Sequence, residues 1–215
     1  FTGRSVAART SQGRCSFALY EGTSDYGELV ICDGVNEPFL FQMTGTDSDI
    51  TNRTFFAKEI TVSGTTGPAV GVIHDKHLVV AGASTAKNTI FYSGTNDIDD
   101  FTSTGSGSIV IEDAVVGLAS FRSDLIIFCK NSIHKLVNIN DSSNVAVVPI
   151  TTNVGCVSGG SIQEIGGDLL FLSPDGVRTV AGTARIGDVE LGSVSRQIQS
   201  LISDIAADKD YIITS

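Results

Sequence analysis

Two histidines three residues apart are the first residues whose types and spacing suggest chemistry. His74 and His77 enclose Asp75 in the string HDKH, and imidazole and carboxylate groups are common metal ligands. Ligands three apart share one face of a helix, but this segment is typical of a turn that leads into a strand. No third ligand lies nearby in the sequence, so a surface turn is favoured over a metal site. His134 follows another turn, and the sequence identifies no partner for it.

The cysteines indicate neither a metal site nor a disulfide framework. Cys15, Cys32, Cys129 and Cys156 lie far apart, with no CxxC spacing among them. Two of the four, Cys32 and Cys129, end apolar runs, where a thiol behaves as a small hydrophobe. We therefore expect buried thiols without disulfides, and synthesis in a reducing compartment.

Acidic residues gather in segments whose composition is typical of loops. The residues concerned are Asp97, Asp99, Asp100, Glu112 and Asp113. Segment 97–100 lacks the alternating carboxylate spacing of a compact calcium loop. We interpret the whole group as solvated loop residues.

Three further motifs are explained by local structure. Ser-Pro-Asp-Gly at 173–176 resembles part of the Asp-box turn of sialidase-like propellers, but Val180 stands after Thr179 where that box has an aromatic residue. An Asp-Gly pair makes a good β-turn without further function. The glycine-bearing segments 105–108 and 155–160 do not open a helix of a βαβ unit, and GxSxG is absent. The sequence thus predicts no catalytic, cofactor-binding or metal site, and we expect a protein that is not an enzyme.

Composition and charge narrow the function classes. The chain has 215 residues, 41% of them hydrophobic and 18% charged, with 23 glycines and 4 prolines, as in a globular protein of many short strands. Its formal net charge is −10, which disfavours tight DNA binding because phosphate recognition needs a basic surface. The absence of Trp disfavours carbohydrate binding on aromatic platforms. No apolar run reaches the ~20 residues of a membrane-spanning helix, and no signal peptide is recognisable.

Residues 117–137 (GLASFRSDLIIFCKNSIHKLV) predict the best-formed structural element, an antiparallel meander of three strands. The run 125–128 is apolar throughout, which is typical of a strand covered on both faces. Arg122 and Asp124 flank its first turn, where we expect an ion pair. Replacing Ile126 or Ile127 by Asp is predicted to prevent folding, because an unpaired charge would be buried.

Weaker copies of this meander recur along the chain. Leu29, Leu78, Leu125 and Leu169 each open an apolar run after a turn, and they are separated by 49, 47 and 44 residues. A quasi-repeat of about 45 residues matches the blades of β-propellers. We expect an all-β platform over 1–192, with blade-like units near 15–62, 68–111, 115–150 and 156–191. A β-sandwich is the competing fold.

One segment has helical periodicity. In 193–205 the apolar residues are Val194, Ile198, Leu201, Ile202 and Ile205, which share one face of an amphipathic helix. Residues 193–215 are therefore expected to form a short helix and a linker, and the sequence is expected to be part of a longer chain.

Six strings, taken in order, resemble one protein family. They are CDGVNEP (32–38), HLVVAG (77–82) leading to FYS (91–93), GLASFRSDLIIF (117–128), ITTNVGC (150–156), FLSPDGVR (171–178) and DVELGSVSRQIQ (188–199). Together they are similar to the tail nozzle proteins of short-tailed bacteriophages, also called tail tubular protein B. The similarity covers most of residues 28–200.

The resemblance implies a virion structural protein built on a β-propeller platform. Members of the family form a hexameric ring below the portal and adaptor, line part of the DNA ejection channel and offer attachment surfaces to tail fibres. The resemblance implies no catalytic residues, a location in the virion tail, synthesis in the host cytoplasm, and DNA that passes without tight binding. We expect Asp97, Asp99 and Asp100 to face either the lumen or a neighbouring subunit. The alternative is a propeller-type glycan-binding module or glycoside hydrolase, which would need acidic or Arg residues to converge.

Overall fold

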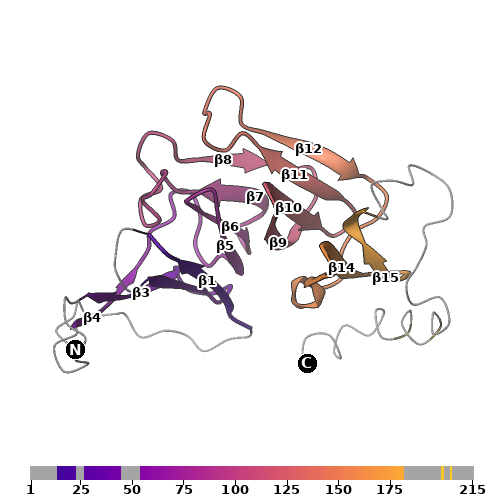
Figure 1. Ribbon diagram of the computed structural model, residues 1–215, viewed down its shortest axis with the longest axis horizontal. Helices are drawn as coiled ribbons and strands as arrows, with labels where there is room; N and C mark the ends of the chain where they lie inside the picture. The colour runs from indigo at the N-terminus through magenta and orange to yellow at the C-terminus, as the bar shows by residue number, and fades with distance from the viewer. Residues whose placement is uncertain (1–13, 23–26, 45–53, 182–199, 201–203, 205–215) are drawn as a thin grey trace. The chain divides into compact units, whose positions relative to one another are not determined.

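The protein is all-β in the part of the chain that the structure describes. The computed structural model describes residues 14–22, 27–44, 54–181, Ser200 and Asp204. These residues form four antiparallel sheets, and each sheet consists of strands that are consecutive in sequence (Figure 1). The predicted all-β class is confirmed.

The four sheets follow one another along the chain. The first contains β1 (Ser16–Tyr20), β2 (Glu28–Cys32), β3 (Phe39–Thr44) and β4 (Thr54–Glu59). The second contains β5 (Val70–His74), β6 (His77–Ala83), β7 (Ala86–Tyr92) and β8 (Gly107–Val110). The third contains β9 (Val115–Phe121), β10 (Asp124–Cys129), β11 (Ile133–Val137) and β12 (Ala146–Thr151). The fourth contains β13 (Gln163–Ile165), β14 (Asp168–Ser173) and β15 (Gly176–Thr179), preceded by the 3-10 turn η2 (Gly159–Ser161).

The four leucines that marked the quasi-repeat hold the same place in their sheets. Leu29, Leu78, Leu125 and Leu169 are each the second residue of the second strand. Three of them are buried, and Leu29 is half-buried. The repetition is therefore one of strand order, because every sheet is a meander of neighbours. Four such sheets do not by themselves establish a closed ring. The expected helix over 193–205 lies outside the described residues, apart from Ser200 and Asp204.

The described chain divides into two compact units. The first holds the first two sheets, up to Val110, together with the loop Asn138–Asn144. The second holds Ile111–Val137 and the chain from Val145 on, and thus the other two sheets. Each unit has a hydrophobic core of its own.

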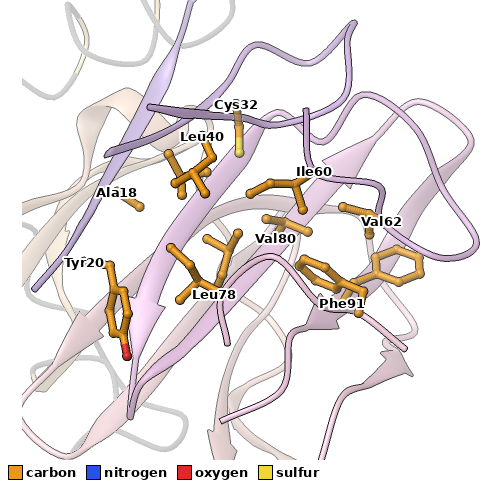
Figure 2. Close-up of a cluster of buried hydrophobic side chains, with 12 residues drawn as sticks. Ala18, Tyr20, Cys32, Leu40, Ile60, Val62, Leu78, Val80 and Phe91 are labelled. Carbon is orange, nitrogen blue, oxygen red and sulfur yellow. The ribbon is translucent and has the colours of Figure 1, made fainter. Parts of the chain in front are cut away.

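The core of the first unit lies between its two sheets (Figure 2). Val30 of β2 and Leu78 of β6 are fully buried in it, and Leu40 of β3 is nearly so. Burying such a side chain stabilises a fold by about 1.5–3 kcal/mol. The edge strands of the two sheets also meet, because the Ser16 hydroxyl donates to the Gly71 carbonyl at 3.2 Å and accepts from the Gly71 amide at 3.2 Å.

The core of the second unit contains the predicted central strand. Leu125, Ile127 and Phe128 of β10 are fully buried and Ile126 is 4% exposed, so the expectation of a strand covered on both faces is confirmed. The Phe128 ring packs against Phe171 of β14, with ring centroids 5.3 Å apart.

The expected ion pair between Arg122 and Asp124 is wrong. Asp124 instead pairs with Lys135 of β11 at 3.6 Å, and the Arg122 guanidinium donates to the Gly167 carbonyl at 2.7 Å. Arg122 lies in the turn between β9 and β10 with a left-handed backbone conformation, at a φ of 56°. Lys135 pairs directly with Ile126, two residues along β10 from Asp124, so a diagonal contact across the strands replaces the local one.

Candidate functional site

The segment from His74 to His77 forms a tight hairpin turn with buried histidines. Asp75 and Lys76 have φ values of 45° and 67°, as the two central residues of a type I′ turn require. His74 is 4% exposed and His77 is 0% exposed. The turn was predicted, but its histidines do not lie on the surface. They are the cross-strand pair that closes the hairpin, because His74 is the last residue of β5 and His77 the first residue of β6.

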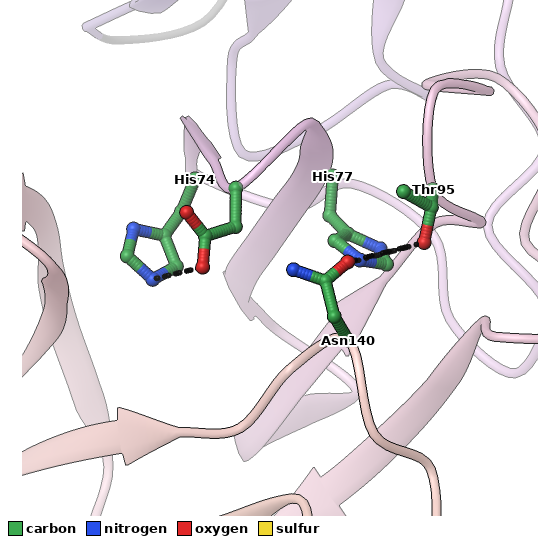
Figure 3. A network of polar contacts seen from close by, with 5 residues as sticks. His74, His77, Thr95 and Asn140 are labelled. Carbon is green, nitrogen blue, oxygen red and sulfur yellow. Dashed lines mark hydrogen bonds and ion pairs between the residues drawn. The ribbon is translucent and has the colours of Figure 1, made fainter.

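His77 joins its sheet to the loop Asn138–Asn144 within the first unit. Its Nδ1 donates to the Ser93 carbonyl at 2.5 Å, and its Nε2 lies 3.0 Å from Asn140 Oδ1 and 3.1 Å from Thr95 Oγ1 (Figure 3). Both ring nitrogens therefore have protein partners, which suits a structural histidine better than a metal ligand. Within the described ranges, no group of three His, Cys, Asp or Glu residues is placed to hold a metal ion.

Asp113 organises the turn between β10 and β11 in the second unit. Its carboxylate accepts hydrogen bonds from the Ala114 amide (2.8 Å), the Asn131 amide (2.6 Å), Asn131 Nδ2 (3.1 Å) and Ser132 Oγ (3.0 Å). Burial is the largest single influence and favours the protonated form, but the hydrogen bonds together outweigh it and lower the pKa of Asp113. The Asp113 carboxylate thus has a structural role in holding the turn, and the interpretation as a solvated loop residue does not apply to it.

Ser132 and His134 complete a Ser, His and Asp set that does not have the geometry of a catalytic triad. His134 Nε2 lies 2.9 Å from Ser132 Oγ. The single hydroxyl proton of Ser132 is given to Asp113, so the imidazole must donate to the serine and cannot act as its base. Burial lowers the pKa of His134, against the opposing charges of Asp113 and Glu112. Ser132 is also 6% exposed, which suits a turn and not a nucleophile.

The four cysteines are free thiols, but the expectation that they are buried is wrong for Cys15. No disulfide links Cys15, Cys32, Cys129 or Cys156, and all but Cys15 are buried. Burial, followed by the nearby charge of Asp113, raises the pKa of Cys129 to about 12. Such a thiol stays protonated at neutral pH and is unreactive.

The carboxylates of Asp100 and Asp175 form hydrogen bonds within their own loop or turn. Asp100 accepts hydrogen bonds from the Thr102 amide and hydroxyl, both at 2.7 Å, and these bonds lower its pKa. In the turn at 173–176, Asp175 pairs with Arg178, whose hydrogen bonds lower the pKa of Asp175. The Asp100 carboxylate thus holds the backbone of its loop, and the Asp175 carboxylate holds the Arg178 side chain. Gly155 also has a structural explanation. A Cβ at this position would stand 2.1 Å from the Lys130 carbonyl oxygen, so the close approach of the two backbone segments requires glycine.

The candidate functional site is a hollow on the first sheet, here called the acidic hollow. Its volume is about 290 Å³, and it is lined by Tyr20, Glu28, Leu40, Gln42, Lys58, Asn96, Asp97, Ile98 and Asp99. Strand register explains the first part of this set. Tyr20 pairs directly with Glu28, and Glu28 with Gln42, so three polar side chains form one row across β1, β2 and β3. Gln42 Nε2 donates to Glu28 Oε1 at 2.5 Å.

The loop after β7 supplies the remaining carboxylates. Ile98 is 2% exposed and Phe101 is 7% exposed, and both belong to the core of the first unit. These two apolar residues anchor the loop, which leaves Asp97 and Asp99 at the hollow. Asp99 forms an ion pair with Lys58 of β4.

Charges of one sign dominate the acidic hollow. Three carboxylates and one ammonium group line it, so negative charge is in excess. Burial raises the pKa of Glu28, the charge of Lys58 counteracts this rise, and the charge of Asp97 adds to it. Burial also raises the pKa of Tyr20, and the charges of Glu28 and Asp97 act in the same direction. The lining residues thus concentrate negative charge, and the charge contributions to the pKa values of Glu28 and Tyr20 agree with this.

Sequence reasoning selected only part of this site. It singled out Asp97 and Asp99, and the structure brings these two together with Tyr20, Glu28 and Lys58, which it missed. A usable signal was present, since Glu28 opens the apolar run ELVIC and Gln42 interrupts the apolar run FLFQM. Glu112 is exposed, and neither it nor Asp113 lines the hollow.

Neither the comparison with protein-family models nor the comparison with curated proteins finds a match. Over the described part of the chain, no helix combines the length and the apolar character needed to span a bilayer.

Proposed function

We propose that the chain is a structural component of the tail of a short-tailed bacteriophage, and that it forms part of the nozzle ring through which DNA leaves the virion. In this proposal the four sheets are blades of a propeller-like platform within a hexameric ring. The ring contacts the adaptor on the portal side and carries tail fibres, and the protein is made in the host cytoplasm. The chain catalyses no reaction.

The observation that carries the proposal is the succession of four meanders of consecutive strands, spaced at about 45 residues. The strings similar to nozzle proteins include parts of this framework: 77–82 lies in β6, 117–128 covers most of β9 and β10, and 171–178 covers much of β14 and β15. A net charge of −10 also suits a conduit that must let DNA pass.

The state of assembly tests the proposal. We expect the intact protein to form rings, with six copies by light scattering and a central opening by negative-stain microscopy. A compact monomer at all protein concentrations would contradict the nozzle function, since one subunit cannot enclose a channel.

The alternative of a glycan-binding module or glycoside hydrolase is favoured by the acidic hollow. Glycosidases use a pair of carboxyl groups, one of them with a raised pKa, and Glu28 beside Asp97 has that character. Incubation with a panel of aryl glycosides distinguishes the two functions. Release of the aryl alcohol that is abolished by Glu28→Gln would support the hydrolase, and the nozzle function predicts no release.

A further inference from the structure

We propose that the acidic hollow binds the cationic head group of a guanidinium or an alkylammonium compound, such as an arginine or lysine side chain. The inference goes beyond the proposed function and does not depend on it. Every residue that carries it belongs to the first unit of a single chain, so it requires no ring and no neighbouring subunit. It stands on charge, on one unsatisfied buried group and on size.

Charge selects a cation. Glu28 and Asp97 contribute two carboxylates, while the third, on Asp99, is already paired with the Lys58 ammonium. The Asp97 carboxylate forms no hydrogen bond or ion pair with the described residues. Because Glu28 is partly desolvated and lies near the charge of Asp97, a bound cation would relieve the repulsion between the two groups.

The Tyr20 hydroxyl is the independent observation that points to a ligand. Tyr20 is 6% exposed, and its oxygen is directed away from the other labelled side chains of the apolar cluster (Figure 2). It lines the hollow and makes no hydrogen bond to the described residues. Buried polar groups nearly always have a partner. An N–H donor placed in the hollow would supply one.

Size and ligand type select an organic cation over a metal ion. A volume of about 290 Å³ is at the lower end for small-molecule sites, which suits a single head group. No set of three metal ligands occurs in the part of the chain that is described. The available oxygens belong to two carboxylates, a phenol and side-chain amides, and the several N–H donors of a guanidinium or ammonium group match them.

Binding of small cationic probes to the whole 215-residue chain tests the inference. N-acetylarginine methylamide and spermidine are titrated separately, and binding is followed by calorimetry and by amide chemical shifts. We expect at least one of the two probes to bind and to shift the amide signals of residues 96–99. We expect Glu28→Gln and Asp97→Asn each to weaken that binding at least tenfold, and Tyr20→Phe to weaken it severalfold.

The matched control is Glu164→Gln, which makes the same chemical change at an exposed position of β13 and should leave binding unchanged. Should Glu28→Gln fail to fold, Asp97→Asn carries the test from a loop. Preference for the arginine compound indicates a protein side chain as the natural source, and preference for spermidine a free amine; both support a cation site. Absence of binding, binding unaffected by both carboxylate variants, or Ca²⁺ alone shifting the same signals would overturn it. A ring that binds no cation would overturn the cation site and leave the proposed function standing. A monomer that binds a cation would support the cation site and contradict the proposed function.

Discussion

At the scale of single residues, several carboxylates that the sequence places in loops and turns have defined structural roles. Asp113 accepts hydrogen bonds from Ala114 and from Asn131 and Ser132 of the β10–β11 turn. Asp100 holds a backbone amide of its loop, and Asp175 holds the Arg178 side chain. A carboxylate that accepts several hydrogen bonds stays ionised at lower pH than a free one. Its contribution to stability therefore depends on pH, which makes it accessible to experiment.

Asp113→Asn should lower the free energy of unfolding by about 1–3 kcal/mol at pH 7, because the amide cannot accept every hydrogen bond that the carboxylate accepts. The pKa of Asp113 is lowered in the folded protein, so its stabilisation is present above the unfolded pKa of about 3.9 and is lost as the pH falls through the folded value. Urea unfolding at pH 7 and at pH 3 measures this difference.

The control for this residue is Asp124→Asn, which removes a half-exposed ion pair with Lys135 and should cost less than about 1 kcal/mol. Equal losses for the two variants, or a loss for Asp113→Asn that persists unchanged at pH 3, would contradict the role given to Asp113.

At the scale of elements, strand β10 is the most completely buried strand of its sheet. Five of its six residues are buried, because β9 and β11 pair with its edges and side chains cover both of its faces. The outer strands β8 and β12 differ from it: Val110 is 71% exposed and Val148 is 39% exposed. The outer strands therefore leave apolar side chains exposed that the central strand buries.

Ile127→Asp, or Ile126→Asp, should abolish cooperative folding, since an unpaired carboxylate buried in this strand has no partner. Circular dichroism and thermal unfolding measure the effect. Val110→Asp is the matched control at an exposed strand position and should change stability by less than about 1 kcal/mol. A soluble Ile127→Asp protein with a sharp unfolding transition would show that β10 is not a core strand.

At the scale of the whole molecule, acidic residues outnumber basic ones, and this excess governs the long-range interaction of the protein with polyanions. A net charge of −10 repels phosphate at long range. Three of the described basic residues, Lys58, Lys135 and Arg178, each pair with a carboxylate. Carboxylates outnumber basic groups by 24 to 14 over the whole sequence, which disfavours the displacement of counterions from a duplex.

We therefore expect no binding of duplex DNA at 150 mM salt, to a limit weaker than the ~10⁻⁴–10⁻⁶ M of ordinary non-specific binding. Fluorescence anisotropy of a labelled duplex measures it, with a basic protein as positive control. Binding that weakens steeply as salt is raised would reveal a basic surface and would count against a channel that lets DNA pass.

The sequence by itself determined the all-β class, the buried strand β10 and the turns at 75–76 and 173–176, because these depend on local alternation and on backbone conformation. The Leu29, Leu78, Leu125 and Leu169 spacing likewise located the second strand of each sheet. Only the tertiary structure decided that His74 and His77 are buried, that Asp124 pairs with Lys135 and not with Arg122, and that Asp113 holds a turn. It also decided that Tyr20, Glu28 and Gln42 share a row with Asp97 above it. Strand register and loop docking bring together residues up to about 80 positions apart, and no local pattern encodes that distance.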